Sequence, residues 1–536
     1  VDGSIANSTV TIQSGGLLGG SGRIGGLVVG SGGVLAPGNS IGTLSVSGSA
    51  TFSSGSVYAV EVDANGRSDR TVVSGSASIQ GGIVSVLAGS GGYGRRTSYE
   101  ILTASGGIGG RFAGVTTNLA FLNPYLSYGA NSVNLLLVRN DVAFASVASS
   151  PNQAATARAD QSLGFGRAVF DAVAGLDDAS ARRAFDGLSG EIHASTVTAR
   201  VRTEDTLRDA LLGRMSGSFT TTVTGLPGFA ASDTVGAAYA ADLPGRRRPP
   251  LAVVPVGPTL DPNVVSVWGQ GFGNFGSIRS DGNAATLRRD LGGFIAGIDA
   301  TLDGRFRFGL AGGYTENSLT ARARSSSASV RSGFGAVYGA ATFGHVTIRM
   351  GGTASGDQTE TSRSATMPGF SDALRGKAGG TTLQGFGEVG YAFDLSGLRM
   401  EPFVGGAAMS LSRDRVTETG GAAALTLAGR SYGVQTLTAG VRGEWSLGPD
   451  SPFALRAMVG YRAAFGDVTP AALATFSAGG TPFQVSGVPV DRNALVAEAG
   501  IAWALSRATT LSVGYAGQIG QRGQDHGVRG NLTYRF

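Results

Sequence analysis

The chain has 536 residues, of which 89 are glycine, 17 are proline and none is cysteine, and only 15% are charged. This length exceeds one ordinary hydrophobic core and indicates two or more structural units. The absence of cysteine excludes a disulfide framework and thiolate metal sites. The net charge of +5 does not indicate nucleic-acid binding, because its densest run, Arg246 to Arg248, precedes prolines and has no interleaved aromatic residues.

Residues 1–140 consist of short apolar pieces separated by glycine. Val10 to Ile12, Thr43 to Val46, Val57 to Val62 and Ile83 to Val86 are examples, and Gly-Gly or Ser-Gly pairs recur between them. Strands of this length without helical punctuation predict the stacked rungs of a β-helix. A stack of rungs needs a covered end, and the less repetitive segment from Tyr99 to Arg139 is expected to supply it.

Residues 141–216 change to a helical pattern. The run from Ser189 to Met215 places apolar residues at three- to six-residue steps without forming a wide apolar face. Its other faces carry charged residues that suit a wet, charged channel, namely Arg200, Arg202, Glu204, Asp205, Arg208 and Asp209. A helix packed on a soluble domain fits the same pattern, so residues 189–215 are a candidate pore helix only. A linker rich in proline follows at residues 217–263.

From residue 264 onward the chain reads as about twelve alternating strands. Apolar residues occupy one face of each strand, and charged residues occupy the other face, where they are expected to line a pore: Asp299, Arg305, Arg307, Arg442, Glu444 and Glu498. An arginine in contact with lipid at mid-bilayer costs roughly 2–4 kcal/mol, so this register predicts lipid outside and water inside. No apolar run reaches the ~18 residues of a membrane helix.

The connections between the strands alternate in length. Short turns are predicted near Gly304, Gly344, Leu395 to Gly397, Gly448 to Ser451, and Ser506 to Arg507. Long polar loops are predicted at Gly276 to Asp290, Ala321 to Ser327, Ser362 to Ala378, Val416 to Gly429, and Asp467 to Asp491. This alternation is typical of an outer-membrane barrel, with short turns in the periplasm.

The last strand ends on an aromatic residue. Val528, Leu532, Tyr534 and Phe536 share one face, while Arg529, Asn531, Thr533 and Arg535 share the other. This pattern indicates a lipid-facing strand at the end of a membrane barrel, where a terminal aromatic residue helps recognition by the insertion machinery.

Motifs in three parts of the chain resemble the monomeric (type Va) autotransporters. The segments Pro37 to Leu44, Tyr58 to Asp63, Ser68 to Arg70 and Tyr99 to Leu102 look like the end of a β-helical passenger with its autochaperone. Leu188-Ser-Gly-Glu-Ile-His-Ala-Ser195 resembles the segment before the family's translocator. Val267 to Gly276 looks like its first strand, and Asn531 to Phe536 looks like its last strand.

The resemblance implies an all-β fold with a helical linker. In this fold a right-handed parallel β-helix fragment precedes a 12-stranded antiparallel transmembrane β-barrel at residues 264–536, and a helix runs through the barrel. It implies export and surface display of the chain's own passenger, with outer-membrane lipid, the barrel assembly machinery and periplasmic chaperones as partners and a monomer as the working form. Since the chain begins at Val1 without a signal peptide, we expect a longer precursor. Self-cleavage at an Asn–Asn pair is not supported, because the chain has no adjacent asparagines.

No catalytic, cofactor or metal site is predicted. Gly38 to Gly42 has the spelling of a nucleophile elbow at Ser40, but its flanks are glycine-rich turns rather than a strand-to-helix turn. Gly271 to Gly276 and Gly385 to Gly390 match the dinucleotide fingerprint without the required βαβ unit. The three histidines are widely separated, which makes a zinc site improbable. Two other functions stay open: a surface adhesin whose β-helix binds host or neighbouring cells, and a porin-like channel.

Overall fold

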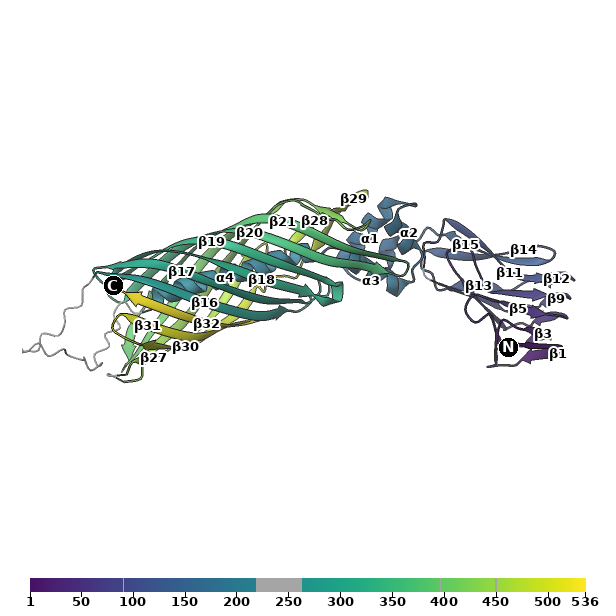
Figure 1. Cartoon of the computed structure of the whole chain (residues 1–536), viewed down its shortest axis with the longest axis horizontal. Coiled ribbons are helices and arrows are strands. Elements are labelled where there is room, and N and C mark those ends of the chain that lie inside the picture. Colours follow the sequence, from purple (N-terminus) through teal and green to yellow (C-terminus); the bar gives the residue numbers. More distant parts are fainter. Residues whose placement is uncertain (90, 218–262, 396, 449–450) are drawn as a thin grey trace, which may run out of the picture.

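The computed structural model describes residues 1–89, 91–217, 263–395, 397–448 and 451–536. Along its longest axis, a β-helix, a group of short helices and a barrel follow one another (Figure 1). The N terminus lies at the β-helix end and the C terminus at the far end of the barrel. Most of the expected Pro-rich linker, residues 218–262, lies outside the described residues.

The N-terminal part is a parallel β-helix with three columns of strands. The first column is β2 (Leu17–Gly20), β4 (Val34–Pro37), β7 (Val57–Val62), β10 (Ile83–Ala88) and β13 (Gly114–Thr117). The second is β5 (Thr43–Val46), β8 (Arg70–Val73) and β11 (Arg96–Ala104), and the third is β6 (Ala50–Phe52), β9 (Ala77–Ile79) and β12 (Ile108–Gly110). The long strand β3 (Arg23–Val29) begins both of these columns and pairs with β1 (Ser4–Ile12).

Equivalent side chains stack from rung to rung inside the β-helix. Val46 pairs in register with Val73, and Phe52 pairs with Ile79. These side chains are at most 3% exposed. Because each rung is only a few residues long, its apolar side chains become buried only through the neighbouring rungs. The N-terminal part therefore has its own continuous core.

A hairpin covers the end of the second column. Strands β14 (Leu122–Tyr128) and β15 (Ser132–Arg139) pair with each other, and β15 pairs antiparallel with β11. Both strands belong to the segment that the sequence assigned to this role. The handedness of the β-helix stays a prediction.

Short helices connect the β-helix to the barrel. They are η1 (Phe144–Val147), α1 (Pro151–Leu163), α2 (Ala168–Ala174) and α3 (Asp178–Leu188), and the long helix α4 (Ile192–Ser216) follows. The side chains of Ser150 and Asp177 accept hydrogen bonds from the backbone N–H groups of Gln153 and Ser180, so they cap α1 and α3. Among the described residues, no helix combines the length and apolar character that a membrane-spanning helix needs.

Twelve long antiparallel strands form the barrel. They are β16 (Val264–Ile278), β17 (Leu287–Leu302), β18 (Phe306–Ala321), β19 (Ser326–Phe343), β20 (Val346–Met367), β21 (Phe370–Tyr391), β23 (Leu398–Arg413), β26 (Arg430–Ser446), β27 (Phe453–Gly466), β30 (Asn493–Ala504), β31 (Thr509–Gly520) and β32 (Gly523–Arg535). The short strand β22 (Phe393–Leu395) extends β21 along β23. The first strand pairs with the last from Ser266–Arg535 to Ile278–Gly523, which closes the sheet and leaves no free edge.

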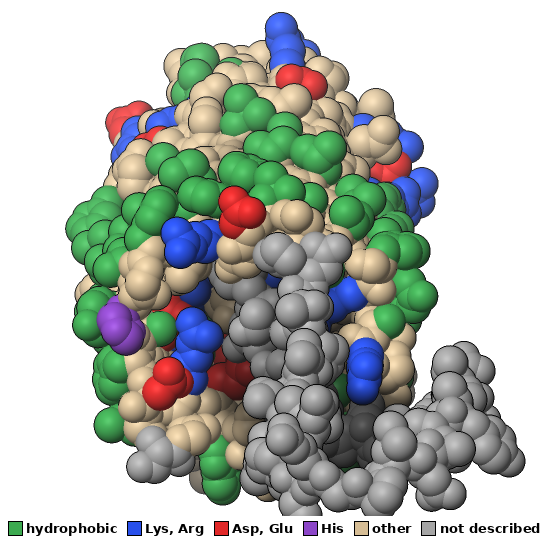
Figure 2. All heavy atoms as spheres, turned by 90° about the vertical axis from the view of Figure 1, so that its left-hand side faces the viewer, with side chains coloured by type: hydrophobic (Ala, Val, Ile, Leu, Met, Phe, Trp, Pro, Cys, Tyr) green, Lys and Arg blue, Asp and Glu red, His purple; other side chains and the backbone are tan. Residues whose placement is uncertain are grey.

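The outer wall of the barrel is apolar. Phe294, Phe308, Leu310, Val337 and Met350 are 55–61% exposed on this wall, whereas charged neighbours in the opposite register are buried inside. Figure 2 looks at the barrel end nearest the C terminus and shows hydrophobic side chains around the outside, with charged side chains within the mouth. The expected alternation of lipid-facing and lumen-facing residues is confirmed.

The two ends of the barrel differ in their connections. At the end nearest the C terminus, which we call the turn end, residues 303–305, 344–345 and 505–508 join neighbouring strands. At the opposite end, the loop end, residues 279–286 join β16 to β17. The longer connections there contain β24 (Val416–Thr417), β25 (Leu425–Leu427), β28 (Ala471–Phe476) and β29 (Gly479–Ser486). Part of the predicted turns at 395–397 and 448–451 lies outside the described residues.

The long loop predicted at Ser362 to Ala378 was wrong. Strands β20 and β21 continue through this segment and pair up to Met367 and Phe370, so only two residues form the turn. The side chains of this segment are mostly polar, and this polar character had favoured a loop. Above the membrane, however, both faces of a hairpin can contact water while the backbone hydrogen bonds continue.

Candidate pore site

Helix α4 lies inside the barrel (Figure 1). From Ile192 to Asp205 every residue is buried, and in the later turns Leu207, Arg208, Ala210, Leu211 and Met215 are buried. The candidate pore helix at 189–215 therefore corresponds to α4. Its six singled-out charged residues all face partners within the barrel or on the helix itself.

One side of the helix packs on aromatic side chains that point into the lumen. Leu207, Ala210, Leu211 and Met215 form a buried cluster with inward-facing residues of the strands β16, β17, β19, β21 and β23. These residues are Trp268, Phe272, Leu291, Ile295, Phe334, Ala336, Tyr338, Ala340, Phe386 and Ala407. Trp268 donates from Nε1 to the Tyr338 hydroxyl at 2.7 Å. The alternation of the strands had suggested a polar lumen throughout, so this apolar contact is a departure from the expectation.

Glycines make room for these inward aromatic rings. A Cβ at Gly309 would lie 2.3 Å from the ring of Tyr338, which sits opposite it on β19. A Cβ at Gly313 would lie 2.7 Å from the ring of Phe334. The aromatic rings can therefore lie flat on the neighbouring strand only because these positions lack side chains.

The loop-end half of the helix is held by charge-assisted hydrogen bonds. Arg200 pairs with Asp357 and donates to the Ser412 carbonyl at 2.8 Å. Arg202 pairs with Asp491 at 3.2 Å. Glu204 accepts hydrogen bonds from the hydroxyls of Thr353 at 2.9 Å and Ser355 at 2.8 Å. These contacts reach β20 and β23 on one side and the connection that precedes β30 on another, so they hold the helix between different parts of the wall.

The middle of the helix carries a compact charge network. Arg208 pairs with Asp205 at 2.8 Å within the helix. Arg462 on β27 donates to both oxygens of Asp209 at 2.9 and 3.0 Å, and it lies 3.5 Å from Asp205. Such paired donors fix the geometry of a buried carboxylate.

Arginines surround the C-terminal end of the helix. Arg214 donates to both oxygens of Asp299 at 2.7 and 3.0 Å, and Tyr338 donates to the same carboxylate at 2.8 Å. Arg307 donates to the Arg214 carbonyl at 2.8 Å, and Arg442 donates to the Ser216 hydroxyl at 2.5 Å. Cations at this end also complement the helix dipole.

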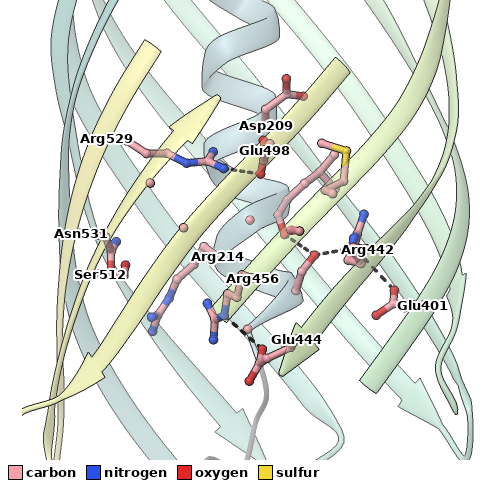
Figure 3. A pocket seen from close by; sticks show the side chains of 18 of the residues that line it. Asp209, Arg214, Glu401, Arg442, Glu444, Arg456, Glu498, Ser512, Arg529 and Asn531 are labelled. Carbon is pink, nitrogen blue, oxygen red and sulfur yellow. Dashed lines mark hydrogen bonds and ion pairs between the residues drawn. The ribbon is translucent and has the colours of Figure 1, made fainter. Parts of the chain in front are cut away.

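The remaining lumen carboxylates are paired between strands. Glu388 and Glu401 both pair with Arg349 and with Arg442. The pair Arg456–Glu444, at 3.1 Å, lies nearer the turn end, and the pair Arg529–Glu498 lies farther from it, beside Asp209 (Figure 3). The predicted lining residues Asp299, Arg307, Arg442, Glu444 and Glu498 are thus all in the lumen.

Arg305 is the exception among the predicted lining residues. It lies in the turn between β17 and β18 and is exposed rather than inside the barrel. Arg305 precedes the first residue of β18. Outside the strand the chain reverses, so the pleat no longer sets the direction of the side chain.

A cavity of about 240 Å³ remains beside the helix on the side of β26, β27, β30, β31 and β32. Its charged lining includes nine arginines and five carboxylates: Arg208, Arg214, Arg307, Arg399, Arg442, Arg456, Arg462, Arg529, Arg535, Asp209, Glu388, Glu401, Glu444 and Glu498. Figure 3 shows several of these side chains, among them Arg442, Arg456 and Arg529, pointing into the space between helix and wall. The helix therefore fills the lumen unevenly, being packed on one side and separated from the other wall by a polar space.

Residues that the sequence reading missed carry much of this site. Arg214 was assigned to the helix but not to the charged set, and Arg349 and Glu401 were not singled out. Trp268 and Tyr338 were not expected to face inward. The inward direction of both side chains could be inferred from the sequence, since the preceding residues Val267 and Val337 face outward. Their contact partners on other strands could not be inferred.

The C-terminal strand lies at the seam of the barrel. Val528, Leu532, Tyr534 and Phe536 are 47–74% exposed on the outer wall. The backbone N–H of Phe536 donates to the Val265 carbonyl at 2.9 Å, so the last residue still pairs with the first strand. The terminal aromatic residue is therefore at the position where the barrel closes.

A closed antiparallel barrel with an apolar outer wall and a charged lumen filled by a helix defines an outer-membrane translocator. Residues 267–516 match the family Autotransporter beta-domain, so the barrel part of the chain is an autotransporter translocator domain. The barrel lies in the outer membrane, with the passenger at the cell surface. The loop end is therefore the extracellular end, and the turn end faces the periplasm.

Two curated relatives and several solved structures are similar to the chain. An extracellular serine protease of Serratia marcescens is 31% identical over all of this chain and 53% of its own length. The chain thus spans about half the length of that relative. The translocator domain of NalP from Neisseria meningitidis is 16% identical, with a TM-score of 0.43, over 51% of this chain and 89% of that domain. The beta domain of the Bordetella autotransporter BrkA is 14% identical, with a TM-score of 0.37, over 51% of this chain and 100% of that chain.

Proposed function

We propose that this chain threads its N-terminal part through its own barrel and then holds it at the cell surface, without performing catalysis itself. The path of the chain is the observation that carries the proposal. Residues before α4 lie beyond the extracellular end of the barrel, α4 occupies the lumen, and the C terminus lies at the periplasmic end (Figure 1). A chain that runs through a closed ring of strands must either have passed through it or have been enclosed by it.

Antibody binding to intact cells tests this proposal. Cells that express the chain are incubated with an antibody to residues 1–140, and bound antibody is measured before and after the outer membrane is permeabilised. We expect the β-helix to be fully labelled in intact cells. Binding that appears only after permeabilisation would contradict the proposal.

We propose that folding of the β-helix end assists export, as an autochaperone does. The segments that carry the family resemblance are bonded to one another in the β-helix. Asp69 accepts hydrogen bonds at 2.9 Å from the backbone N–H groups of both Gly42 and Glu61. The hydroxyl of Tyr58 donates within the core to the Ile101 carbonyl and contacts the Thr71 hydroxyl at 3.1 Å.

Deleting residues 58–102 tests the autochaperone role. We expect normal levels of heat-modifiable barrel but less protease-resistant passenger at the surface. Unchanged passenger resistance would contradict the role. A deletion of the exposed residues 166–167 in the α1–α2 connection is a control that leaves every β-helix rung in place.

We propose that the barrel assembly machinery inserts the chain through the β32 seam, that periplasmic chaperones escort it there, and that it works as a monomer. The exposed aromatic C-terminal strand supports the first of these partners. Crosslinking from a photoreactive residue at position 536 during assembly should capture the insertion machinery. Capture that is equally efficient from position 305, in a periplasmic turn, would refute a specific role of the last strand.

We propose that serine-protease activity, which names the Serratia relatives, is not carried by residues 1–536. Ser40 has a φ of 101° in a β-helix turn, and the chain's histidines are in α4 (His193) or the barrel (His345 and His526). Labelling of the purified chain by a fluorophosphonate, lost in the Ser40→Ala variant, would overturn this proposal. Adhesion through the β-helix remains the second candidate for the passenger, and binding of display-positive cells to host cells tests it.

A further inference from the structure

The segment Leu188 to Ser195 joins α3 to α4 at the extracellular mouth, and the pore contacts described above do not involve it. Gly190 has a φ of 65°, which favours glycine, and a Cβ there would lie 2.5 Å from Leu425 Cδ1 of an extracellular loop. Leu188 is fully buried in a cluster that includes Leu425 and Leu427. The bend before α4 is therefore fitted closely against the loop that connects β23 to β26.

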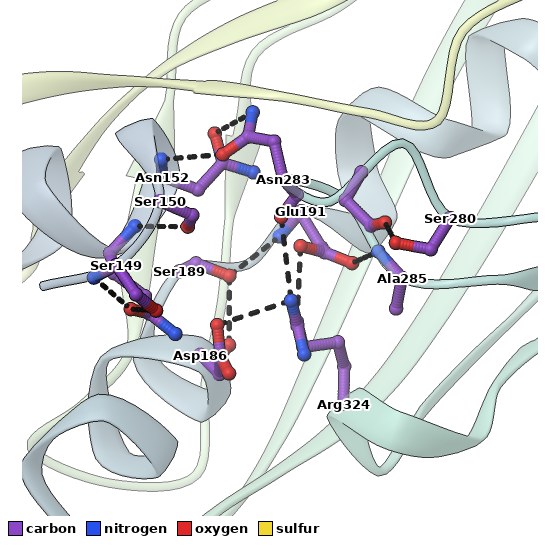
Figure 4. A network of polar contacts seen from close by, with 12 residues as sticks. Ser149, Ser150, Asn152, Asp186, Ser189, Glu191, Ser280, Asn283, Ala285 and Arg324 are labelled. Carbon is purple, nitrogen blue, oxygen red and sulfur yellow. Dashed lines mark hydrogen bonds and ion pairs between the residues drawn. The ribbon is translucent and has the colours of Figure 1, made fainter. Parts of the chain in front are cut away.

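Glu191 is held by two other connections (Figure 4). It is 2% exposed and accepts a hydrogen bond at 2.7 Å from the Ala285 N–H in the β16–β17 loop. Arg324, in η2 (Arg322–Arg324) between β18 and β19, lies 3.1 Å from Glu191 and 3.1 Å from Asp186 at the end of α3. A single carboxylate thus joins the start of α4 to the first two extracellular connections.

His193, in the first turn of α4, contacts the β23–β26 loop. Its Nε2 lies 2.8 Å from a carboxylate oxygen of Glu418. Glu418 also accepts hydrogen bonds from Arg363 at 2.6 Å and from the Leu425 N–H at 2.8 Å. The side chains of His193, Glu418 and Arg363 are at most 3% exposed, so the Glu418 carboxylate is buried among its partners at the mouth of the barrel.

The β27–β30 connection, which contains β28 and β29, completes the contact. The Val488 N–H donates to the Ser195 hydroxyl at 3.1 Å, and the Thr198 hydroxyl donates to the Val488 carbonyl at 2.5 Å. A Cβ at Gly487 would lie 2.4 Å from the Ser195 nitrogen, so the loop backbone lies directly on the helix. Four extracellular connections therefore close on residues 188–198.

These contacts place the extracellular connections across the route that an exported chain would take. With α4 in the lumen, the four connections leave no room for a second segment, and Glu191 and His193 supply partners to Ala285, Arg324 and Glu418 that another passing sequence would not supply. A buried carboxylate without its partners costs several kcal/mol, so this closed arrangement is specific to residues 188–195 rather than to any passing helix.

We propose that Leu188 to Ser195 is a latch that ends export: when it reaches the extracellular mouth, the loops close on it, seal the pore and fix the position of α4. This inference rests on the proposed export function. It assigns to the segment a role after translocation, in sealing and registration, rather than a role in moving the passenger.

The test compares two pairs of isosteric substitutions in the full chain. The latch pair is Glu191→Gln with Glu418→Gln. The control pair is Glu316→Gln with Glu360→Gln, two outward-facing carboxylates in the loop-end halves of β18 and β20. They pair with Arg331 at 3.1 Å and Lys377 at 2.8 Å but are 48–49% exposed. We measure surface display by binding of an antibody to residues 1–140 on intact cells. Channel opening is recorded in planar bilayers, and access to the pore is measured as maleimide labelling of a Thr206→Cys substitution, since the chain has no cysteine of its own.

We expect normal display from both pairs. The latch pair should raise open probability and the labelling rate at position 206 by about tenfold or more, the change that 1.4 kcal/mol produces, while the control pair should leave both unchanged. Unchanged opening and labelling in the latch pair would overturn the latch. Loss of display with a heat-modifiable barrel would also overturn it, because the segment would then act in export itself.

A second variant tests the latch in case the protein with the latch pair of substitutions does not fold. Gly487→Ala alters only the loop side and forces the loop away from Ser195, so it should also raise opening and labelling, and a failure to do so would refute the latch. Failure of the proposed function has a different signature, since the unsubstituted chain would then show no surface-accessible β-helix.

Discussion

Replacing Asp299 with asparagine should release the C-terminal end of α4 from the barrel wall. Asp299 is 2% exposed, accepts hydrogen bonds from Nε and Nη2 of Arg214 at 2.7 and 3.0 Å, and accepts another from Tyr338 at 2.8 Å. Asparagine keeps the shape and the hydrogen bond to Tyr338 but removes the charge opposite Arg214. Removing one partner of a buried ion pair costs about 3–5 kcal/mol.

The matched control is Glu316→Gln. Glu316 pairs with Arg331 at 3.1 Å, but both side chains are about half exposed. Exposed pairs of this kind contribute about 1 kcal/mol or less. The same loss of charge should therefore have very different consequences inside and outside the barrel.

The assay combines urea unfolding of the purified protein in detergent with single-channel recording. We expect Asp299→Asn to lower the unfolding free energy by at least about 3 kcal/mol and to lengthen open events, since the helix end is no longer held. Equal unfolding free energies for the two variants, within about 1 kcal/mol, would refute the view that this ion pair fixes the helix.

Three further predictions concern separate parts of the chain. Deleting Phe536, or replacing it with aspartate, should impair insertion, measured as the amount of heat-modifiable barrel; normal levels would contradict a role for the terminal residue. Gly309→Ala should lower stability by about 1–3 kcal/mol because it displaces Tyr338, whereas Gly335→Ala, with nothing within 4 Å of its added Cβ, should be neutral in the same urea titration. Burial raises the pKa of Asp69 to about 6, above its ordinary value. The β-helix should therefore lose stability as pH rises through about 6, and the Asp69→Asn variant should show a flatter pH dependence of its denaturation midpoint.

The strands and their orientation follow from local sequence. A period of two residues, with charges kept to one face, places Phe308 outside and Arg307 inside whatever the strand pairs with, because the pleat alone sets side-chain direction. The closing strand and its aromatic end are readable for the same reason. Prediction of side-chain direction fails where the strand ends, as at Arg305. Prediction of strand length fails where polar strands continue beyond the membrane, as in the hairpin of β20 and β21.

The contents of the lumen could not be read in this way. The sequence offered a charged helix but left a soluble packing surface as an equal alternative, since an amphipathic pattern does not say what it faces. The partners of Arg214 and Glu191 lie 85 and 94 residues away, on strands and loops whose register is set only when the barrel closes. The sequence by itself determined a membrane barrel behind a β-helix, because alternation and rung length are local properties. Only the tertiary structure decided which residues hold the helix and close the mouth, because those contacts depend on distances between segments that the chain brings together from far apart.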